Sequence, residues 1–170
     1  DLKEREPLGA GWYATPYVEF LHGKGRFDDA LTAARTLGSR EFKMQHYIGE
    51  ALAGQALLGL GQVEEAKKSA ARAASLYRAA RKETAGTRYA RRAPKKHPYE
   101  ETLKGLLELH GRNPEKGGKR LLKMADELAA NTRFDAWGEG LFHLDRIAAE
   151  AQRAGRPKLA VDLAERMKKI

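Results

Sequence analysis

Apolar residues recur along this chain at intervals of three and four, which is the spacing of a helix that buries one face. The stripe is clearest over residues 40–60, and similar stripes run over residues 63–81 and 99–110. Alanine and leucine dominate the apolar set, and β-branched residues are few. This balance favours helix over strand. The pattern therefore predicts an all-α chain without a strand.

Glycine and proline divide the stripes into separate helices. Gly25 and Gly61 each end one apolar stripe and precede the next. Thr15 followed by Pro16 is typical of a helix N-cap and first helical position. The predicted helices are 16–22, 27–37, 40–60, 63–81, 99–110, 114–128, 133–154 and 157–170. Since the connections are short, they pair into four antiparallel hairpins.

A short phrase recurs at three of these turns: a turn glycine, then an alanine five residues on and another four after it. Its three copies are Gly25–Ala30–Ala34, Gly61–Ala66–Ala70 and Gly155–Ala160–Ala164. A repeated helix–turn–helix unit indicates a stacked array, because one hairpin cannot bury its own apolar face.

The spacing resembles the tetratricopeptide repeat, a helical hairpin of about 34 residues. The second hairpin fits the family pattern best, and the first and last also follow it. Its matching residues are Gly54, Gly61, Val63, Ala66, Ala70 and Ala73. The third hairpin fits only if its turn is one residue longer, which places Gly117, Leu121 and Met124 at packing positions. The resemblance implies a right-handed α-solenoid of about four hairpins over residues 12–170, with an irregular segment at 1–11 and a basic insertion at 82–98.

In this family the first helix of each hairpin lines a concave groove that holds a peptide. Carrying these positions over implies a partner-binding groove of Glu19, His22, Gln55, Glu101, Glu108, Asp145, Gln152 and Arg153. The best-known subclass grips a C-terminal carboxylate with lysine and asparagine, and this chain has Glu19, Gln55 and Ala51 at those places. We therefore expect no such clamp. The resemblance implies a non-catalytic scaffold that binds a peptide or a partner domain, with homo-oligomerisation as a further option.

The charge suggests an alternative partner. The chain carries a formal net charge of +9, and much of it lies between residues 81 and 97. The basic residues there are Arg81, Lys82, Arg88, Arg91, Arg92, Lys95 and Lys96. Tyr89, His97 and Tyr99 stand among them, so charge and stacking groups coexist as in nucleic-acid-binding segments. Binding of nucleic acid or another polyanion is the second hypothesis; an acidic protein partner, or a solvated insertion, explains the same charge.

No residue pattern indicates catalysis, a metal or a cofactor. There is no cysteine, which excludes a disulfide framework and a thiolate zinc site. His46 and Glu50 are one helical turn apart but lack a second pair of ligands. The run from Gly117 to Arg120 partly resembles a phosphate-binding loop, but Asn113 and Arg120 replace residues that such a loop needs. An accessory domain of a larger enzyme is the third hypothesis.

The remaining expectations concern aromatic residues and the setting of the chain. Tyr17, Phe20 and Phe142 are expected in the core, and Trp12 and Trp137 at the ends of the array or against a partner. No apolar run is long enough to span a membrane. The chain begins with an aspartate rather than methionine, so we expect a trimmed piece of a longer protein. The compartment stays open, with the cytoplasm favoured over the periplasm or secretion.

Overall fold

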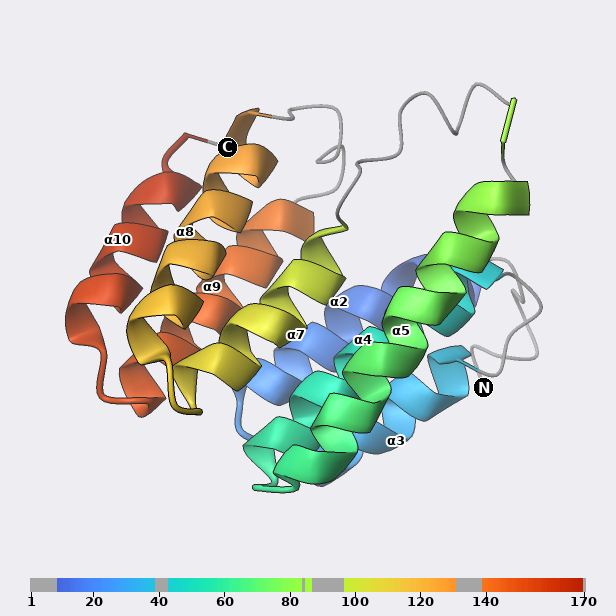
Figure 1. The fold of residues 1–170 in the computed structure, drawn as a ribbon, viewed down its shortest axis with the longest axis horizontal. Coiled ribbons are helices and arrows are strands. Elements are labelled where there is room, and N and C mark those ends of the chain that lie inside the picture. The colour runs from blue at the N-terminus through green and yellow to red at the C-terminus, as the bar shows by residue number, and fades with distance from the viewer. Residues whose placement is uncertain (1–8, 39–42, 84, 87–96, 131–138, 170) are drawn as a thin grey trace.

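The structure is a computed structural model that describes residues 9–38, 43–83, 85–86, 97–130 and 139–169 of the chain. Within these ranges the chain forms helices and no strand, as the sequence predicted (Figure 1). The eight described helices are α2 (Gly9–Gly23), α3 (Phe27–Gly38), α4 (Lys43–Gly59), α5 (Val63–Glu83), α7 (Pro98–Leu109), α8 (Pro114–Ala130), α9 (Glu139–Arg153) and α10 (Pro157–Met167). None of them has both the length and the apolar character needed to cross a bilayer.

Consecutive helices pack as four hairpins: α2 with α3, α4 with α5, α7 with α8, and α9 with α10. Three of the turns place a glycine in the left-handed region, with φ of 73° at Gly25, 75° at Gly61 and 70° at Gly155. A side chain at these positions would be strained, which explains the recurring glycine. The turn between α7 and α8 is longer by one residue, as predicted, and leads into Pro114 at the start of α8.

Adjacent hairpins contact one another, and so do the first and the last. Helix α4 contacts α2, α3 and α7, while α8 contacts α9 and α10. Helix α2 also packs against α9. The first helices of the four hairpins (α2, α4, α7 and α9) therefore surround a common centre, with α3 and α5 on one side and α8 and α10 on the other (Figure 1). An open solenoid would keep its first and last hairpins apart.

The core follows the predicted stripes. Fully buried apolar side chains come from every hairpin, and they include Val18, Leu21, Leu37, Tyr47, Leu52, Leu103, Leu106, Leu121, Leu144, Ile147 and Leu163. Gly117 is buried where α7 and α8 approach closely, and a Cβ there would meet the backbone of Gly105 and Leu109. The three packing positions assigned to the third hairpin, Gly117, Leu121 and Met124, are all buried, as predicted.

Two local predictions were wrong. Helix α2 begins at Gly9 and contains Pro16 inside it, so Thr15 is not an N-cap. A proline inside a helix removes one backbone hydrogen bond and crowds the preceding turn, yet α2 continues past it, with Val18 and Leu21 in the core. The expected core aromatics Tyr17, Phe20 and Phe142 are instead 56%, 54% and 55% exposed. The side chains of Trp12 and Trp137 lie outside the described residues.

Candidate functional site

Four of the eight groove residues are buried, and Glu19, His22 and Gln55 among them line the common centre. Glu19, His22, Gln55 and Glu101 retain 2%, 2%, 1% and 8% of their accessible surface. Helices α2, α4, α7 and α9, which were expected to line an open groove, instead face one another around these side chains. A peptide cannot reach Glu19, His22 or Gln55 in this conformation, because the packing of α2 against α9 closes the array over them. Glu101 instead faces α8, where it pairs with Arg120.

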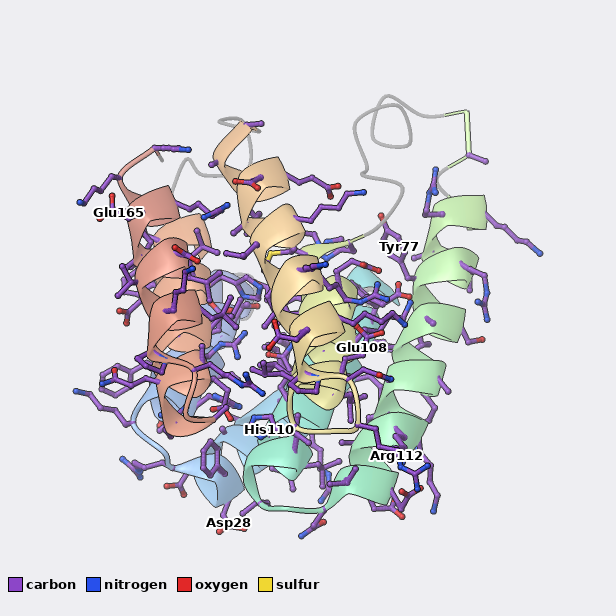
Figure 2. All side chains as sticks on the ribbon, turned by 60° about the vertical axis from the view of Figure 1, so that its left-hand side comes forward. Asp28, Tyr77, Glu108, His110, Arg112 and Glu165 are labelled. Atoms are coloured by element: carbon purple, nitrogen blue, oxygen red, sulfur yellow. The ribbon has the colours of Figure 1, made fainter. Side chains whose placement is uncertain are left out.

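The other four groove residues lie nearer the surface. Asp145 and Gln152 are exposed on α9. Arg153 donates to the Glu150 carboxylate and, over 3.3 Å, to the backbone oxygen of Gly23. Glu108 is half-buried on α7 and pairs with Arg120 of α8; it is labelled in Figure 2. The structure therefore does not bring the eight predicted residues together as one accessible surface.

At the centre, a chain of hydrogen bonds joins α7, α9 and α2. Thr102 Oγ1 lies 2.8 Å from Nε2 of His143, and His143 Nδ1 bonds to the Glu19 carboxylate. Arg146 lies 3.7 Å from the same carboxylate oxygen. Burial lowers the pKa of His143, an effect that Glu19 partly offsets. With neutral His143 protonated at Nδ1, Thr102 donates to Nε2 and His143 donates to Glu19.

A second set of hydrogen bonds joins α2, α4 and α7. His22 Nε2 donates to the backbone oxygen of Gln55 over 3.2 Å, and Gln55 Nε2 donates to the backbone oxygen of Tyr99 over the same distance. Burial, and then the nearby charge of Arg146, lower the pKa of His22 to about 3. His22 is therefore neutral at physiological pH and serves as a hydrogen-bonding link between helices.

The order Thr102–His143–Glu19 matches the nucleophile, base and orienting acid of a catalytic triad. Thr102 has no exposed surface and His143 is 3% exposed, so no substrate can approach the hydroxyl in this conformation. The three residues tie helices together across the centre. Glu19 was predicted from the sequence as a groove residue, but Thr102 and the link to His143 were missed, because the three residues lie far apart in the chain. The available signal was a polar residue on the buried face of each helix.

Two of the three stacking groups proposed for nucleic acid, His97 and Tyr99, are buried in an aromatic cluster. Tyr47, Tyr77, His97 and Tyr99 pack with ring centroids 4.8 Å apart for Tyr47–His97 and 5.5 Å for His97–Tyr99. Tyr47 accepts a hydrogen bond from the backbone nitrogen of Glu100 over 3.1 Å. Burial lowers the pKa of His97 to about 3. Neither His97 nor Tyr99 presents a ring to solvent; Tyr89 lies outside the described residues.

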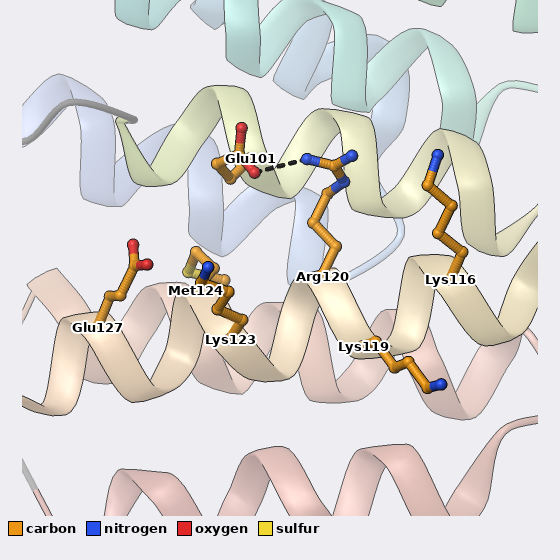
Figure 3. A pocket seen from close by; sticks show the side chains of 7 residues that line it. All are labelled: Glu101, Lys116, Lys119, Arg120, Lys123, Met124 and Glu127. Atoms are coloured by element: carbon orange, nitrogen blue, oxygen red, sulfur yellow. Dashed lines mark hydrogen bonds and ion pairs between the residues drawn. The ribbon is translucent and has the colours of Figure 1, made fainter.

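Of the predicted basic segment, the structure describes Arg81 and Lys82, both exposed near the end of α5. Arg88, Arg91, Arg92, Lys95 and Lys96 lie outside the described residues. A second basic group lies on α8; part of it, the run from Gly117 to Arg120, was considered from the sequence only as a phosphate-binding loop and rejected. Together with Glu101 of α7 it lines a pocket of about 250 Å³ (Figure 3). The lining consists of Glu101, Lys116, Lys119, Arg120, Lys123, Met124 and Glu127.

Large apolar side chains are exposed on α2 and α9, the two helices that close the array. They are Tyr17, Phe20, Leu141 and Phe142. Phe20 follows Glu19 and Phe142 precedes His143, and Glu19 bonds directly to His143. Arg153 at the end of α9 bonds to Gly23 at the end of α2, so the two helices run parallel, and Phe20 and Phe142 therefore lie on the same outer side of the helix pair. We call the exposed side chains Tyr17, Phe20, Leu141 and Phe142 the aromatic seam.

No group of three or more His, Asp or Glu side chains within the described ranges is arranged to hold a metal ion. Glu50, the partner suggested for His46, accepts a hydrogen bond from Arg72 over 2.8 Å. Comparisons of the chain with protein-family models, with curated proteins and with solved structures found no match.

Proposed function

We propose that this chain is a non-catalytic protein–protein interaction scaffold whose partner binds the aromatic seam on α2 and α9. The observation that carries the proposal is the exposure of the seam: Tyr17, Phe20 and Phe142 are each more than half exposed. Exposed aromatic side chains on neighbouring helices are typical of protein-binding surfaces, and aromatic residues dominate the binding energy there. The burial of Thr102 supports the non-catalytic part of the proposal.

The charges around the aromatic seam indicate the chemistry of the partner. Lys24 Nζ lies 5.7 Å from the centroid of the Phe20 ring. Arg153, on the same helix as Phe142, lies 5.6 Å from the ring of Phe27. An apolar centre with Lys24 beside Phe20 and the exposed Asp145 carboxylate one turn after Leu141 fits a protein surface that offers apolar anchor side chains with charges of both signs around them. Net self-repulsion of a chain with charge +9 makes a second copy the less favoured occupant.

We also propose that the array is tetratricopeptide-like, a right-handed stack of hairpins whose two ends touch. Three turn glycines with positive φ support this assignment. The small residue expected at Gly54 supports it too, because a Cβ there would crowd Leu103 and Ser69. The closing contact between α2 and α9 moves the binding surface proposed for this chain from the concave side of the array to its outer side.

Site-specific photo-crosslinking tests the proposal. A photoreactive phenylalanine analogue in place of Phe20 should crosslink a protein in the native host, and the same analogue at Val161 of α10 should not. With the purified partner, Phe20→Ala and Phe142→Ala should each weaken binding about tenfold by calorimetry. Val161→Ala is the matched control, since Val161 is 59% exposed. Unchanged affinity in both aromatic variants would refute the seam.

A further inference from the structure

We propose that the pocket between α7 and α8 binds an acidic polypeptide segment, a run of aspartate or glutamate side chains. The site is separate from the aromatic seam, and the inference does not rest on it. The pocket is lined by four cationic side chains and two carboxylates. Along α8, Lys116 is followed about one helical turn later by the adjacent Lys119 and Arg120, and these by Lys123 about one turn further, so positive charge recurs roughly every 5.4 Å.

The carboxylate of Glu101 in the pocket and that of Glu108 beside it are already engaged by the protein. Arg120 donates to Glu101 Oε2 over 2.6 Å and to both oxygens of Glu108 over 2.9 and 3.1 Å. Lys116 lies 2.9 Å from Glu108. These bonds hold the pKa of Glu108 below its usual value, with Arg120 as the largest cause. The bonds from Arg120 to Glu101 and Glu108 thus fix the Arg120 side chain in place.

Two lysines remain for a ligand. Lys119 and Lys123 line the pocket, and neither forms an ion pair within the described part of the chain. Figure 3 shows Arg120 directed toward Glu101, and Lys119 on the opposite side of α8. The pocket therefore combines one cation held by the protein, Arg120, with two flexible ones, Lys119 and Lys123. An incoming carboxylate would meet the outer lysines without displacing an internal pair.

The surroundings favour an acidic polypeptide over single-stranded nucleic acid. Binding of single strands uses exposed aromatic rings as stacking platforms. The aromatic rings packed on α7 are buried in the cluster of Tyr47, Tyr77, His97 and Tyr99. Met124 and the lysine stems offer an apolar wall, and the Glu127 carboxylate can accept hydrogen bonds from peptide nitrogens. Alternate side chains of an extended peptide lie about 6.7 Å apart, within reach of flexible lysines one turn apart.

Fluorescence anisotropy tests the site with labelled decaglutamate and the whole chain at low ionic strength. Lys119→Gln with Lys123→Gln should weaken binding about 25-fold, or about fivefold per lysine. The matched control is Lys67→Gln with Lys68→Gln, which removes the same charge from exposed positions on α5 that pair with Glu64 and Glu65. The control should change affinity less than about threefold, because screened distant charges contribute little.

Three further probes make the test decisive. Decathymidylate should bind more weakly than decaglutamate, and equal or tighter binding would overturn the choice of ligand. Equal weakening by both double variants, or no binding of decaglutamate, would overturn the site itself. The site would also be overturned if a variant with intact Lys119 and Lys123 lost binding on changing the predicted basic segment to glutamine, at Arg88, Arg91, Arg92, Lys95 and Lys96. Phe20→Ala should leave decaglutamate binding unchanged, which separates this inference from the proposed function.

Discussion

Removing the Glu19 carboxylate should destabilise the closed array far more than breaking an ion pair at the surface. The side chains of Glu19, His143 and Arg146 are 1%, 3% and 2% exposed. Glu19→Gln keeps the shape of the side chain but leaves the Arg146 guanidinium buried without its closest carboxylate. Breaking a buried pair in this way costs about 3–5 kcal/mol. The cost arises from the charge left behind, not from the value of the original bond.

The matched control is Asp126→Asn, which breaks the pair between Asp126 and Arg166, 2.7 Å apart with Asp126 54% exposed. Exposed pairs contribute about 0–1 kcal/mol, so this change should be small. Guanidinium unfolding followed by far-ultraviolet circular dichroism gives both free energies.

Glu19→Gln combined with Arg146→Met should recover much of the loss, because no unpaired charge remains. If Glu19→Gln costs no more than Asp126→Asn, or if the double variant is as unstable as the single one, the buried pair of Glu19 and Arg146 does not have the stabilising role described here.

Three other measurements probe the fold. Burial lowers the pKa of His22 and of His97 from 6.5 to about 3, so between these pH values the folded chain binds fewer protons than the unfolded chain. The free energy of unfolding should therefore fall as the pH drops from about 7 to 4, by at most about 3 kcal/mol for each histidine. Unfolding curves that coincide at several pH values would contradict this. Gly61→Ala should cost about 1 kcal/mol because φ is 75°, whereas Gln62→Ala beside it should be nearly neutral in the same assay. Leu103→Ala should cost about 2–5 kcal/mol, since the side chain has no exposed surface, and a melting temperature equal to the parent's would refute that.

Helices and turns could be predicted because their signals are local. Pro114 and Pro157 begin helices where the sequence placed them, and Gly25, Gly61 and Gly155 end turns with the expected backbone. The longer third turn was also predictable. Each of these features depends on residues within a few positions of one another.

Features that depend on distant partners could not be predicted. Helical spacing marks Glu19 and Val18 as neighbours on one face of α2, but nothing near them in the chain shows that α9 covers that face. The wrong prediction for Phe20 has the same cause. Its hydrophobic character suggested the core, but Glu19 faces His143 of α9, and Phe20 therefore points away from that contact. The pairing joins residues 124 positions apart, beyond the range of any periodicity.

The contact between α2 and α9 also has consequences for how the chain folds. In a linear stack, each unit needs only its immediate neighbours, so terminal units can fray and units can be added or lost. Here the first helix finds one of its partners only after the seventh described helix has formed. During synthesis the polar face of α2 therefore stays exposed to solvent until most of the chain has left the ribosome. Once α9 packs against α2, the first and last hairpins contact each other, and we expect the four hairpins to unfold together as one cooperative unit.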